Sequence, residues 1–214
     1  MRIGIMGGTF DPIHLGHLVT AEAARHQFSL EQVLFVPSGQ PPHKLGRQVT
    51  GAEHRYLMTF LAIASNPDFQ IARLEIDRPG HSYTFDTVMQ LAAEYGSAAE
   101  LYFITGADVM RDILTWHRAG ELLKSCHFVA ASRPGFTLEN YMAKEDLARF
   151  RDQGNIHFIS VPAMAISSTD VRRRVASGES IRYLVPDAVE NYIYKNRLYI
   201  PENHATCSDP FMIR

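Results

Sequence analysis

Short runs that are apolar at every position alternate along this chain with segments of helical periodicity. The run at 33–36 reads VLFV and the run at 101–105 reads LYFIT, so both faces of these predicted strands suit burial. Strands of this kind, separated by helices, are typical of an α/β fold with a mostly parallel sheet. In such sheets ligands bind beyond the carboxyl ends of the strands.

This alternation fixes where the elements are expected. Strands are predicted at Ile3–Met6, Gln32–Val36, Gln70–Leu74, Leu101–Thr105, His127–Ala131 and Ile156–Val161. Helices are predicted at Leu15–Gln27, Ala52–Ser65, Thr84–Tyr95, Glu121–Lys124, Glu139–Arg149, Ser168–Ala176 and Pro186–Lys195. The last two follow the final strand, so the fold should end in C-terminal helices. The stretch Pro37–Gly51 is long for an α/β connection, as binding loops often are.

Composition narrows the class of protein. A length of 214 residues suits one large domain or one domain with a small appendage. The net charge of −2, with both signs scattered, argues against a protein that binds nucleic acid or an acidic membrane surface. Cys126 and Cys207 are too few for a disulfide framework or a four-thiolate zinc site. Without an apolar run of the roughly 18 to 20 residues that span a membrane, a soluble, cytoplasmic protein is expected.

The stretch GGTFDPIHLGH, Gly7 to His17, joins the first predicted strand to the first predicted helix. Gly7 and Gly8 let the backbone turn sharply and approach a ligand without a Cβ in the way. The helix that follows presents unpaired N–H groups and the positive end of its dipole to the same place. His14 and His17 are three residues apart and would share a face of the first turn. Together these features indicate an anion site, and phosphate is the natural ligand.

Other interpretations of this stretch are weaker. A metal site needs a third and usually a fourth ligand, and nothing nearby has zinc-finger or metalloprotease spacing. The glycine spacing fits neither a dinucleotide-binding GxGxxG nor a Walker A loop. Either histidine alone would be expected only to cap or pack the helix.

A second motif lies near the other end of the chain. ISSTDVR, Ile166 to Arg172, places hydroxyl side chains before an apolar helical pattern. By itself it equally describes an ordinary N-capped helix. Together with His14-Leu15-Gly16-His17, however, it resembles the paired HxGH and ISSTxxR signatures of the nucleotidyltransferase superfamily. The resemblance implies a doubly wound, Rossmann-like sheet.

Three further motifs narrow the resemblance. PPHK (Pro41–Lys44), SYTFDT (Ser82–Thr87) and TWHR (Thr115–Arg118) are similar to motifs of the bacterial nicotinate-nucleotide adenylyltransferases. The resemblance covers residues 2 to about 199, which predicts a single nucleotidyltransferase domain at 1–199 and a tail at 200–214. It implies transfer of the adenylyl group of ATP to nicotinate mononucleotide, giving deamido-NAD and pyrophosphate. Mg²⁺ is expected to be carried by the ATP phosphates, with no metal ligands from the protein.

The resemblance also implies roles for individual residues. His14, His17 and Arg172 would be catalytic and stabilise charge on the transferring phosphates. Asp108 would accept from ribose hydroxyls, although an aspartate there could instead cap a helix. Arg133 would form part of the adenine-side wall, or could be a surface charge. The full set implied for ATP is Gly7, Gly8, Thr9, Phe10, Gly106, Asp108, Arg133, Ser167, Ser168 and Thr169.

A second set is implied for the mononucleotide. Trp116, the single tryptophan of the chain, would stack on the pyridine ring, although a lone tryptophan is more often a core residue. Backbone amides near Thr84 and His117 would hold the nicotinate carboxylate and so favour the acid over the amide. The residues implied for this substrate are His43, Lys44, Tyr83, Thr84, Trp116 and His117. His43 and Lys44 would meet the mononucleotide phosphate, or belong to an exposed basic loop.

Alternatives of two kinds stay open at this point. One is an adenylyltransferase that prefers nicotinamide mononucleotide or, more remotely, phosphopantetheine. The other is a nucleotide-binding sensor without turnover, against which the presence of His14, His17 and Arg172 argues. Homo-oligomer formation is possible and the sequence does not decide it.

Overall fold

The computed structural model describes residues 1–41, 49–132, 145, 154–162 and 165–201. The sheet is parallel throughout and has the strand order β3-β2-β1-β4-β5-β6. Its strands are β1 (Arg2–Gly8), β2 (Gln32–Pro37), β3 (Phe69–Ile71), β4 (Glu100–Gly106), β5 (His127–Ser132) and β6 (Ile156–Ser160). The order reverses direction between β1 and β4, which is the switch point where a doubly wound sheet binds its ligands. The predicted α/β class and doubly wound sheet are therefore confirmed.

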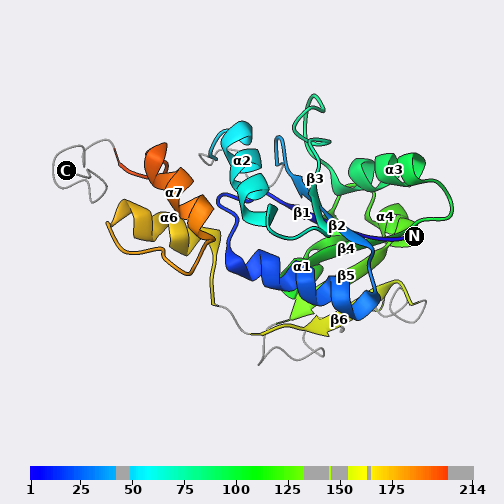
Figure 1. Ribbon diagram of the computed structural model, residues 1–214. Helices are drawn as coiled ribbons and strands as arrows, with labels where there is room; N and C mark the ends of the chain where they lie inside the picture. The colour runs from blue at the N-terminus through cyan, green and yellow to red at the C-terminus, as the bar shows by residue number, and fades with distance from the viewer. Residues whose placement is uncertain (42–48, 133–144, 146–153, 163–164, 202–214) are drawn as a thin grey trace.

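Helices cover both faces of the sheet (Figure 1). They are α1 (Leu15–Phe28), α2 (Ala52–Ile63), α3 (Thr84–Tyr95), α4 (Ala119–Ser125), α6 (Ser168–Ala176) and α7 (Asp187–Lys195), with short 3₁₀ turns at Ala107–Arg111 and Ile113–Thr115. One apolar cluster packs α1 and α2 against the sheet and includes residues of α6 and α7. The other packs α3 and α4 against the opposite face. Two buried layers explain why VLFV and LYFIT are apolar at every position.

Helix α7 packs against α2, and α6 lies on the same side of the molecule, beyond the sheet (Figure 1). The imidazole Nδ1 of His54 in α2 lies 2.9 Å from the hydroxyl of Tyr192 in α7, a hydrogen bond between the two helices. At the start of α1, the amide of Leu15 donates to the carbonyl of Leu184 at 3.0 Å. The segment between α6 and α7 is thereby joined to the residues that follow β1.

Most predicted bounds lie within one or two residues of the observed ones, and the third strand differs most. The third strand was expected at Gln70–Leu74, but β3 ends at Ile71. The amide of Ala72 makes the last bond to β2, and the amide of Asp77 then donates to the carbonyl of Arg73 in a turn. The short helix expected at Glu121–Lys124 runs from Ala119 to Ser125. The helix predicted at Glu139–Arg149 lies mostly outside the described residues.

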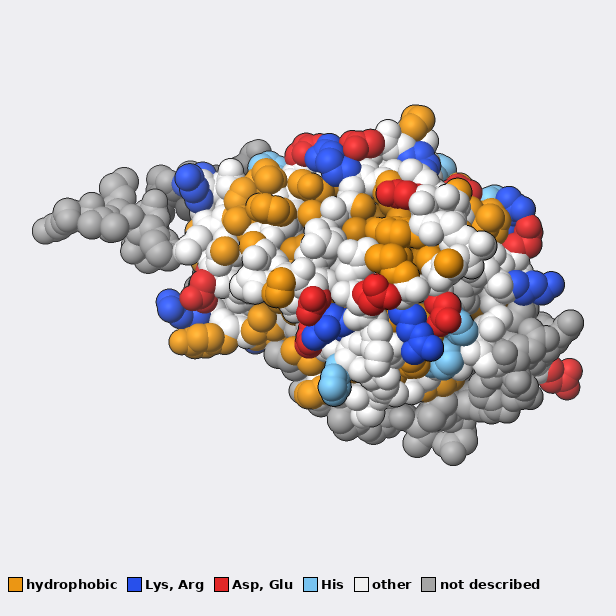
Figure 2. All heavy atoms as spheres, turned by 45° about the vertical axis from the view of Figure 1, so that its right-hand side comes forward, with side chains coloured by type: hydrophobic (Ala, Val, Ile, Leu, Met, Phe, Trp, Pro, Cys, Tyr) orange, Lys and Arg blue, Asp and Glu red, His pale blue; other side chains and the backbone are white. Residues whose placement is uncertain are grey.

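The face of the molecule drawn in Figure 2 shows no single dominant charge. On the face drawn in Figure 2, basic and acidic side chains are interspersed among apolar ones, and no continuous basic stripe runs over the described residues. No described helix is long and apolar enough to cross a membrane.

Candidate active site

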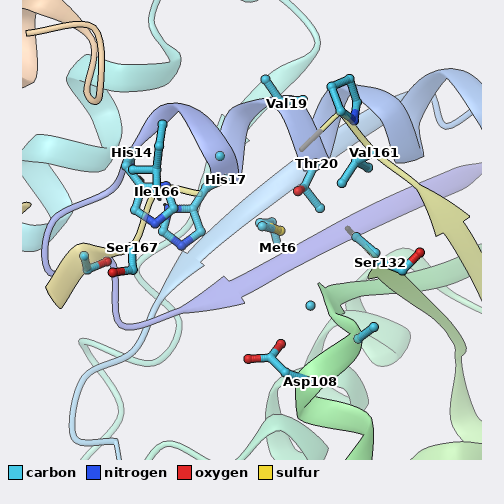
Figure 3. Close-up of a pocket in the computed structure, with 16 residues that line it drawn as sticks. Met6, His14, His17, Val19, Thr20, Asp108, Ser132, Val161, Ile166 and Ser167 are labelled. Atoms are coloured by element: carbon cyan, nitrogen blue, oxygen red, sulfur yellow. Dashed lines mark hydrogen bonds between the residues drawn. The ribbon is translucent and has the colours of Figure 1, made fainter. Parts of the chain in front are cut away.

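A cavity of about 340 Å³ opens at the carboxyl ends of the strands, at the switch point. Its walls come from the start of α1, the segment after β4, the ends of β5 and β6, and the start of α6. Figure 3 shows His14, His17 and Ser167 on one side, Asp108 on another, and Met6 between them. The lining residues are Met6, His14, Gly16, His17, Val19, Thr20, Gly106, Ala107, Asp108, Ala131, Ser132, Val161, Pro162, Ile166, Ser167 and Ser168.

The two histidines form a stacked pair at the N-terminus of α1. Their ring centroids are 3.7 Å apart with an interplanar angle of 24°, as the spacing of three residues predicts. His14 is the N-cap residue and is 7% exposed. The backbone N–H of His14 donates to Nδ1 of His17 at 3.2 Å. This bond fixes the orientation of the His17 ring.

His17 is held in the neutral form. Burial lowers its pKa well below the usual value, and the neighbouring His14 lowers it further. Because Nδ1 of His17 accepts from a backbone N–H, the proton of the neutral ring is on Nε2. His17 therefore has one N–H donor to offer a ligand.

The N-terminus of α6 forms the facing wall. Ser167 is its N-cap and accepts from the amide of Asp170 at 3.1 Å, so the capping interpretation of ISSTDVR is correct. Ser168 donates its hydroxyl to the carbonyl of Pro12 at 2.8 Å, which joins α6 to the segment after β1. Ser167 and Ser168 line the cavity, whereas Thr169 does not. Two helix N-termini thus converge on one cavity, and their dipoles add a positive field there.

Arg172 lies one turn into α6 and contacts the segment before His14. Its Nη1 donates to the backbone carbonyl of Asp11 at 2.5 Å and lies 3.9 Å from the carboxylate Oδ2. Asp11 is 3% exposed, and the hydroxyl of Tyr199 donates to its Oδ1 at 2.8 Å. Burial and the adjacent Asp11 carboxylate raise the pKa of Tyr199, so its hydroxyl stays a donor. The guanidinium of Arg172 is half-buried beside the cavity rather than in its lining.

Gly106 and Asp108 follow β4 and both line the cavity, as predicted. Asp108 is not a helix cap: Gly106 is the N-cap residue of the 3₁₀ turn, and no side chain caps it. Asp108 is exposed, and its carboxylate is the charged acceptor of the lining.

Gly7, Gly8, Thr9 and Phe10 lie beside the cavity instead of lining it. A Cβ at Gly8 would approach the Phe10 ring to 2.8 Å, so only glycine fits without displacing that ring. Phe10 itself is 2% exposed, has a positive φ of 49°, and packs edge-on against His17 with ring centroids 5.2 Å apart. The turn after β1 therefore packs against the histidine pair through the ring of Phe10.

The residues predicted for the second substrate gather at another place, around α3 and the 3₁₀ turn that ends at Thr115. The rings of Tyr83 and His117 are 4.4 Å apart, and Thr84 begins α3. Trp116 is half-buried and packs edge-on against Phe103 at 6.1 Å, so it contacts the core without being enclosed by it. A Cβ at Gly7 would lie 3.1 Å from that same Phe103 ring. Phe103 therefore lies between Trp116 and the glycine turn that follows β1. His43, Lys44 and Arg133 lie outside the described residues.

Several lining residues were not predicted from the sequence. Thr20 lies three residues after His17, on the same face of α1. Ser132 and Val161 follow β5 and β6, where the position of ligand sites at strand ends could have indicated them. Met6 carries no such signal because its sequence context is that of an ordinary core residue, and Ile166 was noted only as the first residue of ISSTDVR.

Comparison with known proteins shows which family this chain belongs to. Residues 5–174 match the family model described as cytidylyltransferase-like. A curated relative from Moorella thermoacetica, named "Probable nicotinate-nucleotide adenylyltransferase", is 58% identical over 200 residues, covering 94% of this chain and 92% of its own. A relative of the same name from a Thermoanaerobacter species is 56% identical over 201 residues, covering 93% of this chain and 94% of its own.

Among solved structures, the fold resembles nicotinic acid mononucleotide adenylyltransferase from Plasmodium falciparum. The complex with NaAD has a TM-score of 0.75 at 21% identity, covering 92% of this chain and 97% of that one. The complex with APC has a TM-score of 0.73 at the same identity, covering 92% and 96%. With this fold and the identity to the bacterial proteins, the chain belongs to the nicotinate-nucleotide adenylyltransferases of the cytidylyltransferase-like family.

Proposed function

We propose that this protein transfers the adenylyl group of ATP to nicotinate mononucleotide, forming deamido-NAD and pyrophosphate. The observation that carries the proposal is the convergence of two helix N-termini on one cavity, from motifs at opposite ends of the chain. A phosphate oxygen of the mononucleotide attacks the α-phosphorus of ATP, the bond to the bridging oxygen breaks, and pyrophosphate leaves. No protein nucleophile is needed, so the protein acts by alignment and charge stabilisation.

The ATP phosphates would lie between the starts of α1 and α6. His17, neutral with its proton on Nε2, would donate to the α-phosphate, and His14 would lie against the neighbouring phosphates. Ser167, Ser168 and Thr169 would contribute hydroxyl and amide donors, and Arg172 would face the outgoing pyrophosphate. The amides of Gly7, Gly8, Thr9 and Phe10 would complete the phosphate site.

The nucleoside would occupy the rest of the cavity. The carboxylate of Asp108, beside Gly106, would accept from the ribose hydroxyls, and Arg133 would lie on the adenine side. Met6, Val161 and Ile166 offer apolar contact to a flat base. Ser132, at the end of β5, is a polar residue of the same wall.

The mononucleotide would bind on the side of Trp116. The indole ring would stack on the pyridine ring, with Tyr83 and His117 next to it. Backbone N–H groups at Thr84 and His117 would receive the nicotinate carboxylate, and they disfavour an amide because its NH₂ would meet donors. His43 and Lys44 would meet the phosphate of this substrate.

Magnesium would enter with ATP. In the described part of the chain, no three His, Cys, Asp or Glu side chains lie together as a metal site needs. An ion that enters with ATP would take phosphate oxygens and water as ligands. When bound, it would supply charge neutralisation on the transferring phosphates.

We further propose a cytoplasmic location and no nucleic-acid partner.

The test is pyrophosphate release with ATP, Mg²⁺ and one acceptor at a time. Nicotinate mononucleotide, nicotinamide mononucleotide and phosphopantetheine are compared at equal concentration. Preference for the first supports both the chemistry and the carboxylate site. Preference for the second retains the roles of His14, His17 and Arg172 but contradicts those of the Thr84 and His117 amides. Release with none of them would favour a nucleotide sensor.

A further inference from the structure

Arg55 is the largest fully buried side chain among the described residues, with 1% of its surface exposed. It projects from the first turn of α2, far in sequence from either nucleotidyltransferase motif. A guanidinium stays charged inside a protein, so its burial demands strong acceptors. In the described part of the chain, all the acceptors of its hydrogen bonds are neutral backbone carbonyls.

These carbonyls come from two segments, the turn after β1 and the ends of the connection between β2 and α2. Nη1 of Arg55 donates to the carbonyl of Thr9 at 2.8 Å, in the turn after β1. Nη2 donates to the carbonyl of Gly39 at 3.1 Å, in the segment after β2. Nε donates to the carbonyl of Thr50 at 2.8 Å, just before α2. One rigid group therefore joins the phosphate-side turn to the start and end of the connection between β2 and α2.

Further contacts tie the same segments together. The amide of Thr50 donates to the carboxylate of Asp11 at 3.4 Å. Asp11 is also the residue whose carbonyl accepts from Arg172. Gly39 packs closely against the backbone of Glu75, since a Cβ at Gly39 would lie 2.1 Å from the carbonyl oxygen of Glu75. Arg55 thus lies between the strained turn at Phe10 and a tightly packed loop segment.

We propose that Arg55 is a positioning residue that holds the phosphate-binding turn in one fixed relation to the two described ends of the β2–α2 connection, residues 38–41 and 49–51. The proposal rests on the proposed function, since the two segments then border the two substrates. A planar fork with three separate donors meets three carbonyls at once. The ammonium of a lysine is a single point and cannot meet all three in that geometry.

The decisive variant is Arg55→Lys, which keeps the buried charge but not the fork. We expect kcat for deamido-NAD formation to fall by about 10- to 100-fold and the KM of both substrates to rise, since small displacements of aligned groups have effects of this size. Hydrogen–deuterium exchange should become faster in residues 7–13 and in residues 36–41, while β4 and β5 stay protected. The matched control is Arg73→Lys, because the guanidinium of Arg73 forms exposed ion pairs with Glu53 and Asp77 and lies over the ring of Tyr56. None of these three residues belongs to the two segments that Arg55 joins.

Each outcome decides something. If kcat and both KM values stay at wild-type levels while Tm falls, Arg55 serves stability alone and the proposal is wrong. Faster exchange in only one of the two segments also overturns it. If wild type forms no deamido-NAD but both segments loosen in Arg55→Lys, the proposed function fails and the positioning role stands. Should that variant not fold, Gly39→Ala displaces the same contact from the loop side and must loosen residues 7–13 for the proposal to hold.

Discussion

Replacing His17 by alanine separates chemistry from folding at this site. The substitution removes the Nε2–H donor that we place against the α-phosphate. Loss of one donor to developing charge lowers kcat by about 100-fold or more in comparable sites. It should affect kcat and kcat/KM together, because the interaction forms mainly in the transition state.

The cost to stability follows from the contacts of the ring. The N–H of His14 loses its acceptor, which is worth about 1 kcal/mol. The stacking on His14 and the edge contact with Phe10 add about 1 kcal/mol. A loss of about 2 kcal/mol corresponds to a fall in Tm of about 4–8 °C for a chain of this size. The variant should therefore be folded at ordinary assay temperatures.

The assay pairs pyrophosphate release at saturating substrates with thermal unfolding. His26→Ala is the control, since His26 is an exposed residue in the last turn of the same helix. That variant should keep wild-type kcat. Near wild-type turnover in His17→Ala would refute the donor role. A fall in Tm large enough to unfold the protein would refute the estimate of about 2 kcal/mol for the contacts of the ring.

Three further predictions concern neighbouring residues. Trp116→Ala should mainly raise the KM for the mononucleotide, and an effect confined to ATP in steady-state kinetics would show that the ring is misplaced. Tyr199→Phe removes the donor to the buried Asp11 carboxylate next to Arg172, so unfolding free energy should fall by about 1–3 kcal/mol in denaturant titration; no change would mean that this bond is absent in solution. Because burial and the adjacent histidine lower the pKa of His17, the unfolded chain binds a proton below about pH 6.5 that the folded state does not. Tm should therefore fall as pH drops below about 6.5, less so in His17→Ala, and an equal slope in both proteins would contradict the assignment.

Where local signals were strong, the sequence predicted the structure closely. Helix α6 begins where a serine could cap it, and α3 ends at Tyr95, just before Gly96, whose positive φ of 75° suits glycine. The start of α4 was missed because Arg118 adopts a left-handed conformation with φ 53° that nothing in the sequence indicates. The third strand was predicted too long because its residue types do not show where pairing ends: β3 pairs with β2 only as far as Ile71 opposite Phe35, although β2 continues to Pro37.

The site was predictable as two motifs but not as a network. His14, His17, Ser167 and Ser168 were expected together and do line one cavity. The buried Arg55 was not expected, because a side chain that donates to backbone carbonyls leaves no requirement on the residue types it contacts. Such bonds are set by the three-dimensional path of the chain and carry no spacing pattern.

The bonds from the C-terminal helices to the segment after β1 bear on how the protein acquires activity. Ser168 and Arg172 reach Pro12 and Asp11 across 156 and 161 residues, and Tyr199 reaches Asp11 across 188. Contacts of such long range form late, since the loop they close must first be brought together. During synthesis the first strands can pair well before α6 and α7 leave the ribosome. A nascent chain can thus form a native-like sheet and still lack a complete phosphate site until α6 and α7 have docked.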